Sequence, residues 1–410
     1  MIMVINSINK MKILHICRLG TEGAGNAAFR HSEALERAGY DSKLMALKGN
    51  SEEVVLGIRI SDKIKLFFTK VFNHVIGYPQ FVWHYMAGNY GLWKLDIVKQ
   101  ADIVYIHWIN DFLGYKDIVY LLRTRKRVVW FLHDMWPITG GCHYALSCNN
   151  YKNRCKSCPQ LKRFRNISWI QQKKKIRKWS NHDNFIIASP SRWLADCARK
   201  SSVFKDTKVV VCPNVLDTDV FKPLEKEKCR KALGLEEGKR YLMISAVDAN
   251  NIYKGFDYLC EAISKIKTDN IEFLVVGNVN LKSYPQEIRK RIKPLGFISN
   301  QQKIIEIYNS VEAYVTSSIA ENFPNVVIEA MACGIPVVGF ATGGIPDQIS
   351  HKHNGYLAKY KDSEDLARGI DWVLNSKEYA KLCTNARNYV IKNCSYINVL
   401  KNHSLILNTK

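Results

Sequence analysis

Residues Thr316–Asp347, TSSIAENFPNVVIEAMACGIPVVGFATGGIPD, decide the fold of this 410-residue chain. The segment runs from a β-branched strand pattern through a polar loop into a short apolar helix. Gly334 is placed to end that helix, a buried strand follows at Pro336–Gly339, and Gly343 and Gly344 form the next turn. This order of strand, loop, helix and strand predicts a parallel sheet covered by helices.

The same alternation of β-branched runs and helical patterns extends over the rest of the chain. Parallel strands between two layers of helices follow from it, so the fold class is α/β. The expected strands are Lys12–Ile16, Lys43–Leu47, Ile103–His107, Val128–Leu132, Phe185–Ser189, Lys208–Cys212, Tyr241–Ala246, Glu272–Gly277, Glu312–Thr316 and Pro336–Gly339. The expected helices are Gly25–Ala38, Asp117–Lys126, Ser191–Lys200, Phe256–Lys267, Gln301–Asn309, Val326–Cys333 and Ser363–Asn375.

The strands are too many for one modest sheet, and the pattern restarts near Lys208. We therefore expect two Rossmann-like domains, over residues 11–205 and 206–380, with a cysteine-containing insertion at 140–160 in the first domain. Residues 381–410 are expected to form a helical tail. Because parallel sheets bind ligands at the carboxyl ends of their strands, the loops at those ends should line a central cleft.

A large excess of basic residues indicates anionic partners. The chain has 60 Lys and Arg against 37 Asp and Glu, a formal net charge of +23. Nucleic acid, phosphorylated ligands and an anionic membrane surface all fit such an excess. Much of it lies in residues 162–178, which form either a solvated helix face or a binding patch, and Trp169 and Trp179 favour an interface. The basic residues of this segment are Lys162, Arg163, Arg165, Lys173, Lys174, Lys175, Arg177 and Lys178.

The sequence favours a cytoplasmic protein, either free or attached to the inner face of a membrane. It contains no apolar run of about 18 residues, so no transmembrane helix is expected. Its first residues lack the apolar core and small-residue cleavage site of a signal peptide. In the cytoplasm the 12 cysteines are reduced, and the dispersed ones are small buried hydrophobes.

Two carboxylates, Glu321 and Glu329, flank the loop and the helix start in the opening segment. A carboxylate at the mouth of a βα loop accepts hydrogen bonds from hydroxyls, and a second carboxylate further along can accept them from another pair of hydroxyls. The N–H groups of Asn325 to Val327 face outward at the start of the helix, where they favour an anion. This arrangement suits a ligand with hydroxyls at both ends and phosphate in the middle, as in a nucleotide sugar.

This segment, with its Glu-x7-Glu spacing, resembles the donor-site signature of glycosyltransferase family 4 (group 1), the retaining GT-B enzymes. The His-Asp-Met-Trp-Pro run at 133–137, followed by four cysteines, resembles members that build bacterial surface polysaccharides. The resemblance implies a GT-B fold in which the final helices return to the first domain. It assigns Glu321 to hydroxyls of the transferred sugar and Glu329 to the ribose. It also places in the donor site Asn322, Phe323, Pro324, Asn325 and Val326.

Three further loops complete the expected site. Lys254 follows a strand and can neutralise a diphosphate leaving group, although it can also be an ordinary surface lysine. By resemblance, the loop containing Gly23 and Gly25 closes over the donor phosphates. His133 follows the strand VVWFL, and the resemblance gives it a contact with the donor sugar; the alternative is a structural histidine. We therefore expect His133, Glu321 and Lys254 to be the catalytic residues.

The expected chemistry needs no metal or cofactor. The leaving phosphate can accept the proton of the incoming hydroxyl, so catalysis depends on charge neutralisation and positioning. A second phosphate-binding Arg of the family is missing from SAVDANN at 245–251, where Asn250 or Asn251 could donate neutral hydrogen bonds, or Arg192 could assist. No Asp-x-Asp metal motif occurs in a suitable loop.

Four cysteines lie within one short segment at 142–158. Cys155 and Cys158 form a Cys-x-x-Cys pair, Cys142 and Cys148 precede it, and His143 is an alternative ligand. Four thiolates can close a tetrahedral zinc shell, so we hypothesise a structural zinc; reduced loop cysteines are the alternative.

The resulting hypothesis is a retaining hexosyl-type glycosyltransferase. It would move sugar from a UDP- or GDP-sugar to a growing, lipid-linked surface glycan such as O-antigen, capsule or exopolysaccharide. One alternative is a nucleic-acid- or polyanion-binding protein, which the charge allows although no zinc-finger spacing or RNA-recognition signature is present. Another is a sugar-nucleotide epimerase with the same GT-B fold.

Overall fold

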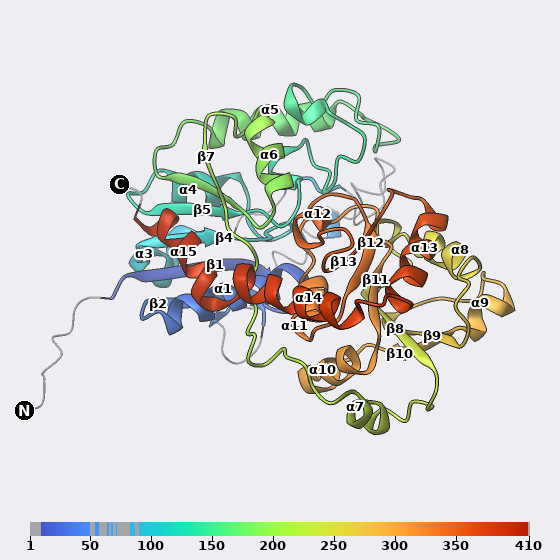
Figure 1. Cartoon of the computed structure of the whole chain (residues 1–410). Coiled ribbons are helices and arrows are strands. Elements are labelled where there is room, and N and C mark those ends of the chain that lie inside the picture. The colour runs from blue at the N-terminus through green and yellow to red at the C-terminus, as the bar shows by residue number, and fades with distance from the viewer. Residues whose placement is uncertain are drawn as a thin grey trace, which may run out of the picture. The chain divides into compact units, whose positions relative to one another are not determined.

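The computed structural model describes residues 10–49, 54–56, 64, 67–68, 71, 83–86 and 90–408. The chain divides into two compact units (Figure 1). The first unit contains Met1–Val215 together with Val399–Lys410, and the second contains Leu216–Asn398.

A seven-stranded sheet forms the centre of the first unit, with strand order β3-β2-β1-β4-β5-β6-β7. Every neighbouring pair in it is parallel. From β1 to β3 each new strand is added toward one edge of the sheet, and from β4 to β7 toward the other edge. The strand order therefore reverses between β1 and β4, which mark a topological switch point. The strands are β1 (Lys12–Leu19), β2 (Asp41–Lys48), β3 (Val54–Val55), β4 (Ile103–Ile106), β5 (Arg127–Phe131), β6 (Phe185–Ser189) and β7 (Lys208–Val211).

The second unit repeats this plan with a six-stranded sheet of order β10-β9-β8-β11-β12-β13. Its pairs are also parallel, and the switch point lies between β8 and β11. The two parallel-sheet, Rossmann-like domains expected for a GT-B chain are therefore confirmed. The strands are β8 (Arg240–Asp248), β9 (Ile271–Asn278), β10 (Ile292–Gly296), β11 (Ala313–Thr316), β12 (Val337–Phe340) and β13 (Gly355–Ala358).

Helices and short 3-10 turns connect the strands. Those of the first unit are α1 (Glu22–Arg37), η1 (Leu92–Lys94), α3 (Asp96–Gln100), α4 (Tyr115–Leu122), η2 (Trp136–Ile138), η3 (Asn150–Lys152), α5 (Ile167–Trp179), α6 (Arg192–Lys200) and most of α15 (Tyr396–Leu407). Those of the second unit are α7 (Lys226–Ala232), η4 (Ile252–Lys254), α8 (Phe256–Ile263), α9 (Gln286–Lys290), α10 (Gln301–Ser310), α11 (Asn325–Ala332), α12 (Ile345–Gln348), α13 (Ser363–Leu374) and α14 (Tyr379–Cys394).

Alternation along the strands of the second unit explains its two hydrophobic layers. Tyr241 and Met243 of β8 point into a cluster with residues of α10, α11 and α14. Leu242 and Ile244 point to the opposite face, into a cluster with residues of α8 and α13. Both faces of the sheet are thus buried, as expected for an all-parallel sheet.

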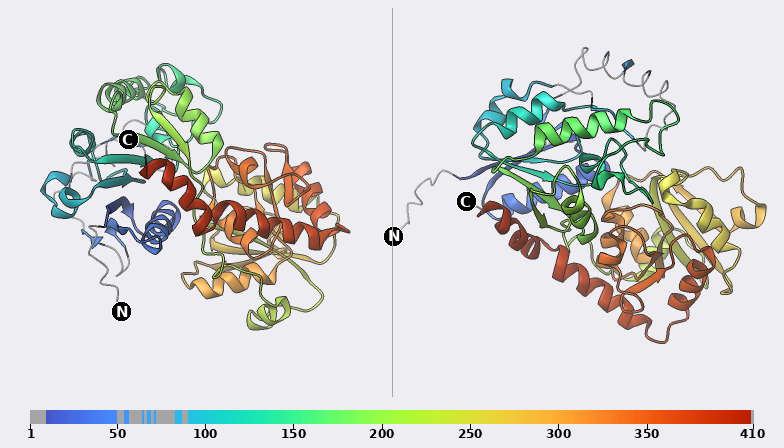
Figure 2. Two further views of the ribbon diagram at one scale, coloured as in Figure 1. Left: turned by 60° about the vertical axis from the view of Figure 1, so that its left-hand side comes forward. Right: turned by 90° about the horizontal axis from the view of Figure 1, so that it is seen from above.

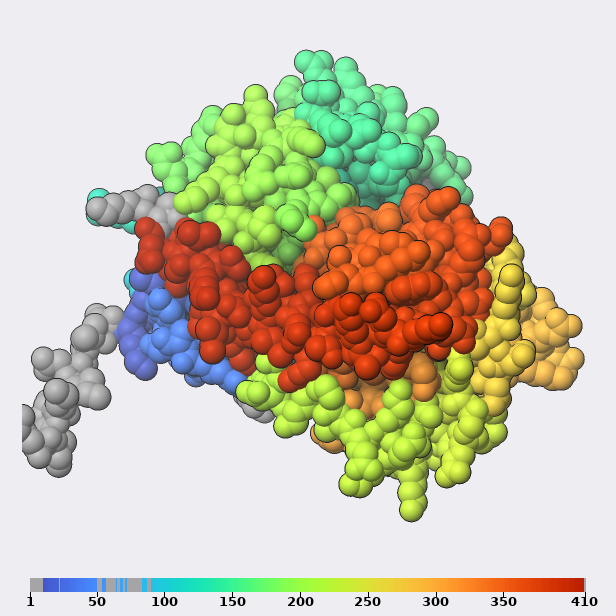
Figure 3. All heavy atoms as spheres, in the orientation of Figure 1, coloured from blue at the N-terminus to red at the C-terminus, as the bar shows by residue number. Residues whose placement is uncertain are grey.

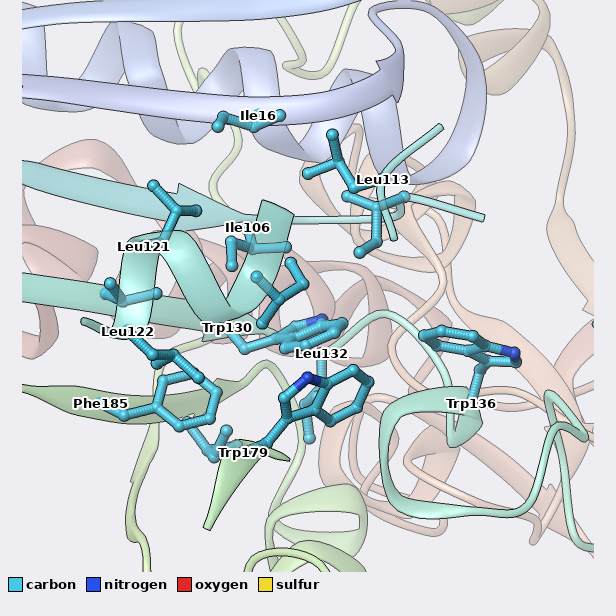
Figure 4. Packing of buried hydrophobic residues seen from close by; sticks show 14 of the residues in the cluster. Ile16, Ile106, Leu113, Leu121, Leu122, Trp130, Leu132, Trp136, Trp179 and Phe185 are labelled. Carbon is cyan, nitrogen blue, oxygen red and sulfur yellow. The ribbon is translucent and has the colours of Figure 1, made fainter. Parts of the chain in front are cut away.

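The first sheet has two faces of different chemistry. One face is apolar: Ile106 and Trp130 pack with Trp179 of α5 and residues of α4 in the largest cluster of this unit (Figure 4). The Trp130 and Trp179 ring centroids lie 4.8 Å apart. The opposite face carries buried histidines, among them His15 of β1, which are described below.

The boundary between the units lies further along the chain than the expected residue 205. The strand expected to open the second domain, Lys208–Cys212, instead pairs in parallel with β6 and forms the edge of the first sheet. Sequence alternation alone cannot decide which sheet a strand joins. At the other end of the chain, α15 belongs to the first unit from Val399 onward, and Arg127 of β5 donates to the carbonyl of Ile406 at 3.0 Å (Figure 1).

Candidate functional site

The second unit brings Lys254 and Glu321 together at its switch point. Lys254 ends η4, which follows β8, and Glu321 lies in the loop that follows β11. The Lys254 Nζ atom lies 2.6 Å from Glu321 Oε1, and the Ser318 hydroxyl donates to the same oxygen at 3.1 Å. The Lys254 side chain is 35% exposed and that of Glu321 13% exposed, so both can reach a ligand. The pair presents a cation and a hydrogen-bond acceptor side by side.

Two glycines let the neighbouring loops approach this pair. Gly255 has φ +59°, and a Cβ atom there would lie 2.2 Å from the Ser317 carbonyl oxygen. Gly343 has φ +53°, and a Cβ atom would lie 1.9 Å from the carbonyl oxygen of Glu321. The Gly344 N–H donates to that oxygen at 3.1 Å. Gly343 and Gly344 thus support the Glu321 backbone, which is a different role from the close ligand approach that glycine at such a turn also permits.

The expected nucleoside-binding residues are mostly enclosed. Glu329 is 9% exposed, and the Tyr308 hydroxyl donates to its Oε2 atom at 3.1 Å. Asn322 and Phe323 are buried, whereas Pro324, Asn325 and Val326 are half-buried. Since the Val327 N–H donates to the Pro324 carbonyl at 3.2 Å, Val327 does not offer the outward donor expected at the start of α11.

The two asparagines considered as substitutes for the missing Arg have other partners. The Asn250 amide donates to the Asn280 carbonyl at 3.2 Å and accepts from the Asn280 N–H at 2.6 Å. Asn251 Oδ1 accepts from the Tyr253 N–H at 3.0 Å and caps η4. Both side chains therefore fix the shape of the loop that holds Lys254.

In the first unit, the glycine loop after β1 is shaped by close backbone contact. The helix α1 begins at Glu22, three residues before the expected start at Gly25. Gly23 interrupts it with φ +23° and ψ −100°. A Cβ atom on Gly25 would lie 2.3 Å from the Leu19 carbonyl oxygen, so only glycine fits this position.

His133 lies at the end of a chain of three hydrogen-bonded imidazoles. His15 Nδ1 is 2.9 Å from His107 Nε2, and His107 Nδ1 is 2.9 Å from His133 Nε2. Burial lowers the pKa of His133 to about 4, against the opposing charge of Asp134. The His133 ring is therefore neutral near pH 7, and its hydrogen-bond partner fixes which nitrogen carries the proton.

His31 and His403 continue the buried histidine layer. His31 Nδ1 lies 3.0 Å from His403 Nε2, and the Tyr105 hydroxyl lies 2.9 Å from His403 Nδ1. The two histidines and Cys212 are the one group of three possible metal ligands, among the described residues, whose ligand atoms lie within 4.8 Å of one another. The hydrogen bond between His31 and His403 accounts for the closeness of the two rings, and burial lowers the pKa of His403 to about 4.

Asp134 belongs to a second network that includes His143. The Asp134 carboxylate accepts from Trp108 Nε1 at 3.1 Å and lies 2.5 Å from His143 Nδ1. The other His143 nitrogen lies 2.6 Å from His84 Nδ1. Burial would raise the pKa of Asp134, but the adjacent His143 and the Trp136 N–H hold it below its ordinary value. His143 is therefore a partner of Asp134 and not a substitute for a cysteine ligand.

The cysteine segment and the basic segment are separate features of the first unit. Cys142, Cys148, Cys155 and Cys158 line a common cavity of about 20 Å³. The basic segment forms α5 and the turn before it, on the outside of the unit (Figure 2, right; Figure 3, green). Trp179 is fully buried and Trp169 half-buried, so Trp179 does not form the interface that its position in the sequence indicated.

Residues 225–392 match the family model of glycosyl transferases group 1. The chain carries a group 1 glycosyltransferase domain. This domain lies within the second unit and contains both Lys254 and Glu321.

Curated glycosyltransferases are similar to parts of this chain. An uncharacterized glycosyltransferase of Methanocaldococcus jannaschii is 30% identical over 187 residues, covering 43% of this chain and 47% of that protein. The putative colanic acid biosynthesis glycosyl transferase WcaC of Escherichia coli is 23% identical, covering 62% of this chain and 64% of WcaC. The chain spans about half the length of the curated relatives it matches first.

The solved structures show the fold. Anabaena HepE in complex with UDP-glucose aligns with a TM-score of 0.64 and 16% identity, over 97% of this chain and all of HepE. WaaG, a glycosyltransferase involved in lipopolysaccharide biosynthesis, aligns with a TM-score of 0.63 and 14% identity, over 97% of this chain and 100% of WaaG.

Sequence reasoning missed the partners that orient the candidate residues. The sequence pattern places His15 in an ordinary strand and Lys175 among the charges of a basic segment. A polar residue inside an apolar parallel strand, as in KILHIC, is the signal that could have identified His15. Lys175 gave no such signal, because it stands among other lysines.

Proposed function

We propose that the chain is a retaining glycosyltransferase that uses a nucleoside-diphosphate sugar, UDP- or GDP-linked, as donor. The observation that carries the proposal is the Lys254–Glu321 pair at the switch point of a group 1 domain. Ligands of open parallel sheets bind at such points. The complex of HepE with UDP-glucose supports a donor of this class.

Each residue of the pair has a distinct task in this proposal. The Lys254 ammonium neutralises the diphosphate as the bond from the anomeric carbon to the phosphate oxygen breaks. Glu321 accepts hydrogen bonds from hydroxyls of the transferred sugar and so fixes its position. The acceptor hydroxyl forms the new bond on the same face, and its proton passes to the leaving phosphate. Glu329, which is 9% exposed, is assigned to the ribose hydroxyls.

For the first unit, the proposal assigns His133 to the transferred sugar and the Gly23–Gly25 loop to the donor phosphates. A neutral imidazole held by His107 suits a hydrogen bond to a sugar hydroxyl, because its N–H and its lone pair have fixed positions. No cofactor takes part in this reaction.

We propose a growing, lipid-linked surface glycan as acceptor. WcaC, a putative glycosyl transferase of colanic acid biosynthesis, and WaaG, a glycosyltransferase involved in lipopolysaccharide biosynthesis, support this class. No helix in the described residues is both long enough and apolar enough to cross a bilayer. Peripheral attachment to an anionic surface is supported by exposed Phe164 and Ile170, which lie among the basic residues of the 162–178 segment. Ile64, Phe67, Phe68 and Val71, at helical spacing, are exposed as well.

The test is a screen of UDP- and GDP-sugars for slow release of the nucleoside diphosphate, with mass spectrometry of the products. One donor class should be consumed, and Glu321→Ala should reduce its turnover at least tenfold. Glu378→Ala, which removes an exposed carboxylate of the same unit, is the control and should retain activity. Consumption of no nucleotide sugar, or equal turnover by both variants, would reject the proposal.

A further inference from the structure

Four cysteine side chains from one loop segment converge on a single small cavity in the first unit. Cys142, Cys155 and Cys158 are buried and Cys148 is half-buried, and all four are free thiols. The cavity they line measures about 20 Å³, room for roughly one water-sized particle. We propose that these four cysteines bind one structural Zn²⁺ ion as a tetrathiolate.

Hydrogen-bond donors already face the sulfur atoms. The backbone N–H of Gly140 is within hydrogen-bonding reach of the Cys155 sulfur, and that of Gln160 is within reach of the Cys158 sulfur. Burial, the larger effect, raises the pKa of both thiols, and these donors oppose that shift. Since the thiolate is the form that binds metal, Zn²⁺ would have to displace the proton from each sulfur.

A buried lysine supplies the second, independent observation. Lys175 of α5 has no exposed surface, and its ammonium donates to the carbonyls of Trp136 and Thr139. The ammonium also lies 3.7 Å from the centre of the Trp136 ring. All these direct partners are neutral, although a buried charge is costly unless an opposite charge compensates it.

Burial lowers the pKa of Lys175 to about 7, against the opposing effect of the nearby Cys155, Cys142 and Asp134. Four thiolates around one Zn²⁺ ion carry a net charge of about −2, so the zinc centre would compensate the Lys175 ammonium. The arrangement connects the metal to the segment that follows His133, because Lys175 holds the carbonyls of Trp136 and Thr139. Zinc would thereby stabilise a loop next to the proposed sugar-binding histidine.

Ligation requires the sulfur atoms to move closer together. Among the described residues, no three of the four sulfurs lie within 4.8 Å of one another. In a tetrahedral shell with Zn–S bonds of about 2.3 Å, the sulfurs are about 3.8 Å apart. Rotation of the cysteine side chains around the cavity, with half-buried Cys148 closing the shell, is the movement that we infer.

The test is metal analysis of the full chain, purified under reducing conditions with an affinity tag that binds no metal. We expect about one equivalent of zinc, and a tetrathiolate absorption spectrum after exchange with Co²⁺. Cys148→Ser should lose the ion or bind it at least tenfold more weakly. Cys383→Ser, which changes another half-buried cysteine outside the cavity, is the matched control and should retain it.

Three results would overturn the proposal. The first is less than a tenth of an equivalent of zinc in the unsubstituted protein, a result that does not depend on how any variant folds. The second is a disulfide between Cys155 and Cys158 in the reduced preparation. The third is zinc that persists in Cys148→Ser but is lost in His403→Gln, which would place the ion at the buried histidines. None of these measurements depends on the proposed transferase activity.

Discussion

Replacing Lys254 by Met separates a catalytic role of this lysine from a structural one. The ion pair with Glu321 joins a side chain that is 35% exposed to one that is 13% exposed, so solvent weakens it. Pairs of this kind contribute about 0–1 kcal/mol to folding. By contrast, a charge-assisted hydrogen bond to a leaving diphosphate contributes about 1.5–3 kcal/mol. Lys254→Met should therefore reduce kcat/KM roughly 10- to 150-fold and lower the free energy of unfolding by no more than about 1 kcal/mol.

The assay combines nucleoside-diphosphate release from the accepted donor with urea unfolding of the same preparation. Lys265→Met is the matched control, because Lys265 also pairs with a glutamate of the second unit, Glu261, at 2.8 Å. The control should change neither quantity. Turnover by Lys254→Met within twofold of the unsubstituted protein would refute the catalytic role. A loss of stability of about 3 kcal/mol or more would show that the lysine acts on the fold.

Three other predictions test the fold and the surface. Gly255→Ala should destabilise the protein by more than about 2 kcal/mol, because its Cβ meets a carbonyl, whereas Gly234→Ala, with φ +60° and open space, should cost about 1 kcal/mol in the same denaturant titration. Phe164→Ser and Ile170→Ser should each weaken binding to anionic vesicles, measured by co-flotation, by about tenfold and leave co-flotation with neutral vesicles unchanged. Unchanged binding to anionic vesicles would contradict the membrane proposal. Burial lowers the pKa of His133 and of His403 to about 4. Between about pH 6.5 and 4 the unfolded chain therefore binds more protons than the folded one. Stability should therefore fall as pH falls through this window, by up to about 1.4 kcal/mol per pH unit for each histidine, and a flat unfolding free energy from pH 6.5 to 5 would contradict this.

Ten of the thirteen strands that the structure describes were predictable, because hydrophobic periodicity marks strands directly, whereas β3, β10 and β13 were not expected. The positions of Lys254 and Glu321 followed as well, since both come just after predicted strands and parallel strands share one functional edge. Periodicity does not show which strand pairs with which other strand. For this reason Lys208–Cys212 was assigned to the wrong sheet, where only pairing with β6 decides.

Helix α5 shows why the burial of single residues could not be predicted. Its buried face consists of Ser168, Gln171, Gln172, Lys175 and Trp179, so polar residues occupy most of the positions that normally carry leucine or valine. The two glutamines each bond the backbone of neighbouring loops, for example Gln172 Oε1 with the Cys155 N–H at 2.7 Å. Hydropathy therefore pointed to a solvated basic face, and only the tertiary structure shows which cation is enclosed.

The return of α15 to the first unit affects the order in which the protein can fold during synthesis. Val399, His403 and Ile406 are buried with no exposed surface, and they leave the ribosome only after all of residues 216–398. Until they emerge, the histidine layer of the first sheet lacks its final covering helix. The N-terminal unit therefore cannot finish before the C-terminal one, although domains generally fold in the order of their synthesis. The nascent chain has to keep an incomplete first sheet soluble while all of residues 216–398 are being made.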